Sequence, residues 1–201
     1  MKVLLNFFSY LFHPLFVPIA GTVSYFFVTP KYSSLELQSG NILPIFILTV
    51  IIPIIFFFIL KNLGLIHSVF ALSIAERKYP LYISIILYLM ILYKVIPQNY
   101  INELYFFFVG LIIASVTVLI LLFLKIKASI HLLGMGSLLL FLIGLSIHFE
   151  VNITFVIAIH TVCTGLVTTS RLFMNAHSRG ELLVGFLIGA SSQLFMFRYW
   201  L

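Results

Sequence analysis

Hydrophobic residues follow one another in long runs along this chain of 201 residues, and short polar stretches separate the runs. A helix needs about 20 mostly apolar residues to cross the hydrocarbon core of a bilayer. Seven runs approach this length and predict membrane-spanning helices, at roughly 4–27, 42–60, 80–97, 104–124, 129–148, 153–169 and 182–199. Pro14 and Pro18 in the first run predict that its start is kinked or interfacial.

The stretch 63–79 is too polar at its end to cross a membrane, and it predicts a short interfacial helix. No internal repeat and no long linker divides the chain. The pattern therefore predicts an all-α polytopic membrane bundle of six to seven transmembrane helices, with 1–201 forming a single integral membrane domain.

Composition supports the same class of protein. Hydrophobic residues make up 63% of the chain, charged residues 8%, and the mean hydropathy is +1.23, whereas soluble domains are about one quarter charged. The net charge of +6 comes from loop residues and not from a soluble basic domain, so we expect no nucleic-acid partner. We expect a multi-pass protein of the cell inner (cytoplasmic) membrane, and Cys163, the single cysteine, excludes a disulfide framework within the chain.

If all seven runs cross the membrane, the connections alternate between its two sides. Connections 61–79, 125–131 and 170–181 then share one side, and 29–41, 98–103 and 149–152 share the other. Three polar clusters all belong to the first set: ERKYP at 76–80, KIKASIH at 125–131 and SRLFMNAHSRGE at 170–181. We expect these clusters to meet at one end of the bundle. Eight of the eleven Lys and Arg lie on that side, which slightly favours a cytoplasmic location for it.

The third cluster pairs a histidine with a carboxylate. Residues four apart share one face of a helix, so a helix that begins near Asn175 lets Glu181 hold one imidazole nitrogen of His177. The other nitrogen then becomes a better nucleophile or base. Arg171 has the planar fork that binds phosphate through two hydrogen bonds, and His131 offers a second proton-transfer group.

Lysines and arginines at loop positions have a second interpretation, because such residues commonly act only as determinants of membrane topology. A zinc site formed by His177, Glu181 and His131 is a further alternative. The four-residue spacing differs from the H-E-x-x-H arrangement, and nearby cations repel a metal ion. We therefore expect no metal and no cofactor.

The motifs at 77–80, 127–131 and 170–181 together resemble the type 2 phosphatidic acid phosphatase superfamily. The third family motif is S-R, five residues, H, three residues, D, and Ser170, Arg171, His177 and Glu181 match its spacing with Glu in place of Asp. The second family motif, P-S-G-H, corresponds to ASIH at 128–131. The first, K, six residues, R-P, is reduced to Arg77 and Pro80, with Phe70 at the lysine position.

The resemblance implies a metal-independent membrane phosphatase that acts on lipid phosphates or diphosphates. His177 would form a phosphohistidine, Glu181 would orient it, and His131 would protonate the leaving oxygen. The implied phosphate-binding residues are Arg171, Arg77, Lys127, Lys78, Ser129 and Ser170. Implied substrates are undecaprenyl diphosphate, phosphatidic acid or phosphatidylglycerol phosphate, and the alternative is a non-enzymatic component with the same fold that binds or transports lipid phosphates.

Three further features favour structural roles. Gly185 and Gly189 form a G-x-x-x-G pattern, which indicates close packing of the last helix. His160 lies about three helical turns from Arg171, so we expect it to hydrogen-bond another helix. His13 is expected to cap the kinked first helix.

Overall fold

The computed structural model describes residues 2–67, 74–96 and 101–201, and all regular structure within these ranges is helical. This confirms the predicted all-α bundle. The helices are α1 (Lys2–Leu11), the 3-10 helix η1 (Pro14–Phe16), α2 (Val17–Val28), α3 (Leu35–Phe46), the π-helix η2 (Ile47–Ile51), α4 (Ile52–Asn62), α5 (Lys78–Lys94), α6 (Asn102–Phe123), α7 (Ile130–His148), α8 (Thr154–Phe173) and α9 (Arg179–Trp200).

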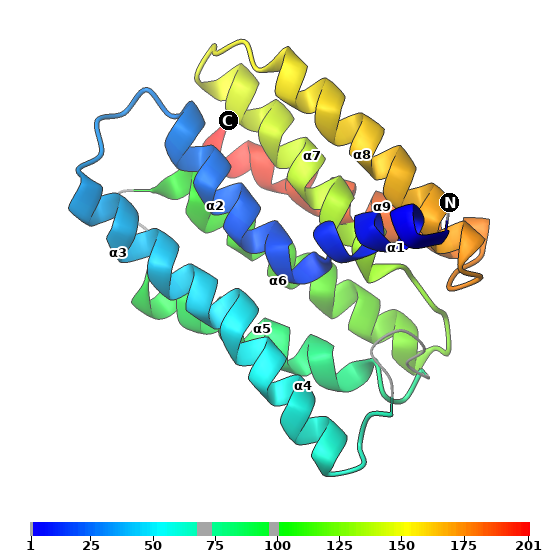
Figure 1. Cartoon of the computed structure of the whole chain (residues 1–201). Coiled ribbons are helices and arrows are strands. Elements are labelled where there is room, and N and C mark those ends of the chain that lie inside the picture. Colours follow the sequence, from blue (N-terminus) through cyan, green and yellow to red (C-terminus); the bar gives the residue numbers. More distant parts are fainter. Residues whose placement is uncertain (1, 68–73, 97–100) are drawn as a thin grey trace.

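Six stretches of the described chain are long and apolar enough to cross a membrane, which makes this a multi-pass membrane protein. They are Phe7–Val28, Leu35–Asn62, Asn102–Phe123, Ile130–His148, Thr154–Phe173 and Arg179–Trp200. The remaining predicted span corresponds to α5, which has 17 residues and is therefore about 25 Å long. The two chain ends lie at opposite ends of the bundle (Figure 1).

The first span is broken where the prolines predicted it. α1 ends at Leu11, η1 covers Pro14–Phe16, and α2 continues to Val28. The Nδ1 atom of His13 accepts the backbone N–H of Leu15 at 3.3 Å, so His13 caps this restart as the sequence indicated. α1 consequently runs at a steep angle to α2 and lies against α8 (Figure 1).

The second span is longer than the predicted 42–60. Ser34 accepts the N–H of Leu37 at 3.2 Å and caps α3 seven residues before the expected start, so part of the predicted loop 29–41 is helical. The π-helix η2 interrupts this span. Pro53 has no N–H to offer the carbonyl four residues earlier, and a local change to i→i+5 bonding accommodates that loss.

The expected interfacial helix within 63–79 is not found in the described part of that stretch. Residues 63–67 and 74–77 form turns and irregular chain, and the rest of the prediction, at 68–73, falls outside the described residues. Gly64 has a φ of +70° directly after α4, where a residue with a Cβ is disfavoured. α4 therefore stops there.

α7 and α9 pack with their backbones in close contact. A Cβ placed on Gly185 would collide with the carbonyl oxygen of Ser129, and one on Gly189 with that of Leu133. The predicted role of the G-x-x-x-G pattern is thus confirmed. His160 on α8 also behaves as predicted, because its Nε2 donates to the carbonyl of Met135 on α7 at 3.0 Å.

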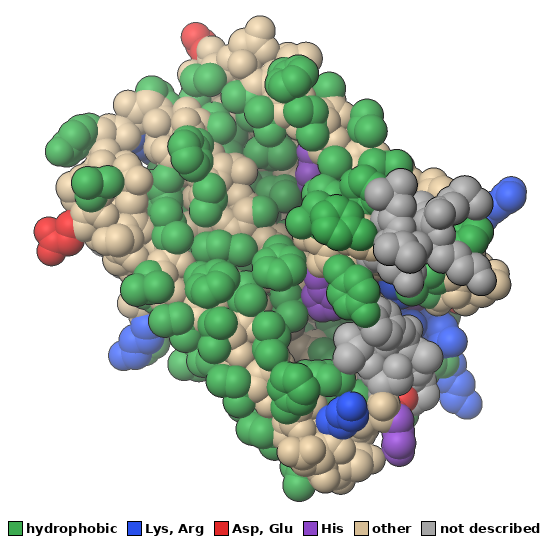
Figure 2. Space-filling model, in the orientation of Figure 1, with side chains coloured by type: hydrophobic (Ala, Val, Ile, Leu, Met, Phe, Trp, Pro, Cys, Tyr) green, Lys and Arg blue, Asp and Glu red, His purple; other side chains and the backbone are tan. Residues whose placement is uncertain are grey.

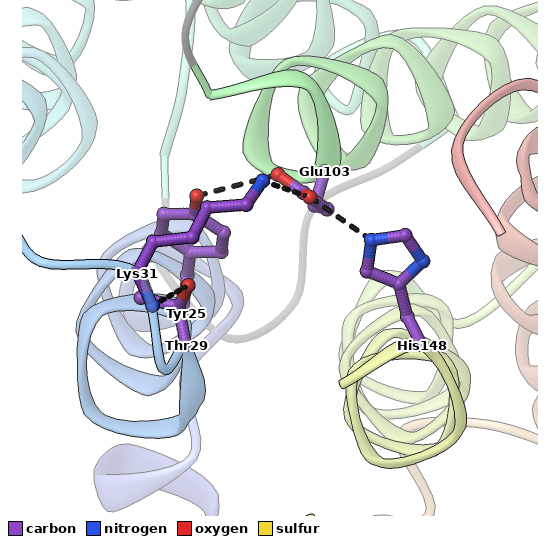
Figure 3. Close-up of polar contacts among 5 residues, drawn as sticks. All are labelled: Tyr25, Thr29, Lys31, Glu103 and His148. Atoms are coloured by element: carbon purple, nitrogen blue, oxygen red, sulfur yellow. Dashed lines mark hydrogen bonds and ion pairs between the residues drawn. The ribbon is translucent and has the colours of Figure 1, made fainter. Parts of the chain in front are cut away.

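A buried carboxylate ties the helices together at the end of the bundle where α2 and α7 finish. Glu103, which is 2% exposed, accepts from Lys31 Nζ at 2.6 Å, from His148 Nε2 at 3.1 Å and from Tyr25 Oη at 3.3 Å (Figure 3). Lys31 and Glu103 come from two connections that the sequence assigned to one side. Their contact supports the alternating topology.

The close contact of α7 and α9 gives a first testable prediction. Gly189→Ala should lower the thermal unfolding midpoint of the detergent-purified protein by several degrees, because overpacking a tight contact costs about 1–3 kcal/mol. Gly165→Ala is the matched control, since a Cβ there meets nothing within 4 Å. Equal midpoints for the two variants would contradict the close contact.

Candidate functional site

A cavity of about 430 Å³ opens at the end of the bundle opposite Glu103, and five polar side chains line one part of it. They come from separate segments: His13 between α1 and η1, Arg77 before α5, His131 in the first turn of α7, Arg171 in the last turn of α8 and His177 before α9. The three polar clusters therefore meet as the topology predicted. Figure 2 shows histidine atoms within a hollow that hydrophobic side chains surround.

His177 and Glu181 form the predicted pair. Nδ1 of His177 lies 2.6 Å from Oε2 of Glu181, and since a carboxylate can only accept, Nδ1 donates. α9 begins at Arg179, four residues later than the expected Asn175, because Ser178 caps it by accepting the N–H of Glu181 at 3.3 Å. Glu181 thus occupies the third helical position, where a capping-box glutamate normally reaches back to the cap. Here it reaches back to the imidazole.

The second nitrogen of His177 faces a guanidinium. Nη1 of Arg77 lies 3.5 Å from Nε2 of His177, and both side chains are buried. Burial is the largest influence on the pKa of His177 and lowers it; Arg77 and Arg171 lower it further, while Glu181 opposes them. The net direction of the pKa shift is downward, so the ring is neutral at pH 7 and its Nε2 carries a lone pair that faces Arg77.

Arg171 is 5% exposed, and its charge is only partly satisfied. Nη1 donates to Oγ of Ser9 at 3.1 Å, whereas Nε is buried and has no partner among the described residues. The neighbouring guanidinium of Arg77 opposes the positive charge of Arg171. Two buried cations that repel one another are costly unless an anion joins them. The buried Nε–H of Arg171 is therefore a group that an anionic ligand would satisfy.

His131 and His13 complete the polar part of the cavity. Nε2 of His131 donates to the carbonyl of Ser9 at 3.3 Å. The rings of His13 and His131 meet edge to face, with their centroids 5.3 Å apart. Sequence reasoning assigned His13 only a capping role and did not single out Ser9. The signal available for His13 was its position at a proline break on the same membrane side as the three clusters.

Four of the predicted phosphate-binding residues do not line the cavity. Nζ of Lys78 lies 4.1 Å from the ring centroid of Phe123, and Lys127 is half-buried away from the site. Ser129 is fully buried, where its Oγ accepts the N–H of Leu132 at 3.4 Å and caps α7. Ser170 is fully buried in the last turn of α8. Arg77 and Arg171 are the predicted cations that reach the cavity.

The alternative zinc site is not assembled. No three His, Cys, Asp or Glu side chains come together as a metal-ligand set in the parts of the chain that the structure describes. The third predicted ligand, His131, bonds to the Ser9 carbonyl instead of joining His177 and Glu181. Two guanidinium groups beside His177 would also repel a dication.

The environment of His177 predicts its titration. Its pKa should lie below the ordinary value of about 6.5, and Arg77→Gln should raise it by removing a nearby positive charge. The measurement is ¹⁵N-histidine NMR of the protein in detergent micelles, with His177→Asn identifying the signal. Lys78→Gln is the control and should leave the pKa unchanged, because Lys78 contacts Phe123. A wild-type pKa above 6.5 would contradict the buried, cationic environment.

Comparison of the chain with models of protein families, with curated proteins and with solved structures finds no match.

Proposed function

We propose that this protein is a membrane-embedded phosphatase of lipid phosphates or diphosphates that works through a phosphohistidine at His177. One observation carries the proposal: Nδ1 of His177 is held by Glu181, and its Nε2 lies 3.5 Å from Nη1 of the buried Arg77 in a cavity that the buried Arg171 also lines. A nucleophile needs a free lone pair, and a phosphoryl group needs cations beside its oxygens. Both requirements meet in one cavity.

The apolar part of the cavity supports a lipid substrate. Beyond these polar groups, and apart from Ser84 and Ser115, its lining is mainly hydrophobic, with side chains from α2, α4, α5, α6 and α7, among them Val17, Phe57, Phe58, Leu81, Tyr88, Leu111 and Leu133. A soluble phosphate ester would leave these surfaces without a partner, whereas an acyl or isoprenyl chain would cover them. The substrate class is a phosphatidic acid, a phosphatidylglycerol phosphate or an isoprenyl diphosphate such as that of undecaprenol. The cell inner membrane is the proposed location.

The proposed reaction has two steps. Nε2 of His177 forms a bond to phosphorus and the bond from phosphorus to the leaving oxygen breaks, while His131, which takes up a proton together with the anionic substrate, gives that proton to the leaving oxygen. A water molecule then attacks phosphorus and gives a proton to His131, while the bond from phosphorus to nitrogen breaks and phosphate leaves. Arg77 and Arg171 would hold the phosphoryl oxygens throughout, and Glu181 would stabilise the positive charge on His177.

One observation favours the second candidate, a protein that binds or transports lipid phosphates without hydrolysing them. Lys78 and Lys127, two of the implied phosphate-binding residues, both lie away from the cavity. The family position of that lysine corresponds to Phe70, which falls outside the described residues. The proposed clamp therefore has two cations, which suffice for binding but offer less charge to a transition state.

Mutation of the two histidines tests the mechanism. His177→Ala should abolish phosphate release from a short-chain lipid phosphate in detergent, because it removes the attacking atom. His131→Ala should reduce kcat about 10²–10⁴-fold, the usual contribution of one acid–base group. His160→Gln is the control, since its amide can still donate to the Met135 carbonyl outside the cavity. Undiminished release by His177→Ala would refute the phosphohistidine, and loss of release on adding a chelator would favour metal catalysis.

A further inference from the structure

The N-terminal helix α1 contacts two groups of the site through one residue. Ser9 is 3% exposed. Its carbonyl oxygen accepts from Nε2 of His131 at 3.3 Å, and its Oγ accepts from Nη1 of Arg171 at 3.1 Å. Because these bonds lead to α7 and α8, a single turn of α1 determines where both side chains lie.

His13 lies four residues after Ser9, just beyond the end of α1, and it lines the cavity itself. Its Nδ1 accepts the N–H of Leu15 at 3.3 Å, so in the neutral ring the proton resides on Nε2. The ring stands almost perpendicular to that of His131, at 82°. A neutral His13 thus brings an N–H donor into the cavity without adding a third positive charge beside the two arginines.

Capping alone does not account for a histidine at this position. Serine, threonine, asparagine and aspartate are the preferred capping residues, and any of them would satisfy the Leu15 N–H with a smaller side chain. The imidazole adds a second nitrogen to a side chain that lines the same cavity as the two buried arginines. The Nε of Arg171, buried and without a partner among the described residues, belongs to the same place.

We propose that α1 is part of the active site: His13 donates Nε2–H to an oxygen of the bound phosphoryl group, and Ser9 is a positioning residue that holds His131 and Arg171. The inference rests on the proposed function in so far as the anion is a phosphoryl group. It adds a substrate contact that none of the three sequence clusters contains.

The test separates donation by His13 from capping. His13→Asn keeps an oxygen that can cap the Leu15 N–H but lacks the ring nitrogen that lines the cavity. It should leave the thermal unfolding midpoint close to wild type and weaken the binding of orthovanadate, a mimic of the transferring phosphoryl group, by about 10- to 100-fold. Isothermal titration of the full-length protein in detergent measures that affinity. Phe7→Ala, at an exposed position on α1, is the control.

Ser9 provides a second variant. Ser9→Ala removes the hydroxyl that accepts from Arg171 but retains the carbonyl that accepts from His131, so orthovanadate affinity should fall several-fold. Ser9→Thr keeps the hydroxyl oxygen, so its orthovanadate affinity should equal that of the wild type. Failure of Ser9→Thr to restore affinity, or no effect of Ser9→Ala, would overturn the positioning role.

The outcomes distinguish this inference from the proposed function. Wild-type affinity for orthovanadate in His13→Asn would overturn the inference while leaving phosphate release as evidence for the enzyme. A wild-type protein that binds orthovanadate without releasing phosphate would refute the phosphatase, and the inference would then stand or fall on the His13→Asn affinity. A wild-type protein with no orthovanadate affinity would refute both.

Discussion

The site depends on the contact between the backbones of α7 and α9. Gly185 and Gly189 allow α9 to lie directly on the carbonyl groups of Ser129 and Leu133, and the N–H of Ser129 donates to the Glu181 carbonyl at 3.0 Å. This bond joins the beginnings of the two helices. Side chains near both beginnings are thereby held together without any direct bond between them. In a bilayer, where apolar burial provides little force between helices, such close packing is a main source of their association.

The two ends of the bundle differ in how the protein compensates their buried charges. At one end Glu103 is surrounded by Lys31, His148 and Tyr25, so its buried negative charge is compensated within the protein. At the other end Glu181 is engaged by His177 and Glu76 by His67, and two buried arginines, Arg77 and Arg171, line the cavity. A balanced network stabilises a structure, whereas an unbalanced buried charge requires a ligand of opposite sign. At the cavity end the buried Nε of Arg171 has no partner among the described residues, and an anion is the kind of ligand that would satisfy it.

Much of the site could be predicted from the sequence, because it depends on helical periodicity and on which connections share a side of the membrane. Counting apolar runs was sufficient to bring 76–80, 125–131 and 170–181 to one end, and a four-residue spacing was sufficient to pair His177 with Glu181. The direction of individual side chains did not follow. Lys78 is the first residue of α5 and directly follows Arg77, yet its Nζ lies over the ring of Phe123 and not in the cavity. Such directions are set by packing between helices and not by local sequence.

The roles of Ser9 and His13 also could not be predicted from local sequence. Neither belongs to a motif, and their role depends on the angle at which α1 crosses the bundle after the proline break. The alternation of the chain then has an electrostatic consequence. α5, α7 and α9 all begin at the cavity end, next to Arg77, His131 and His177 respectively. Each helix N-terminus carries roughly half a positive charge. α4, α6 and α8 end on the same side, and their C-termini carry the opposite partial charge, so alternation of the chain offsets the helix dipoles there and leaves the charged side chains to set the potential of the cavity.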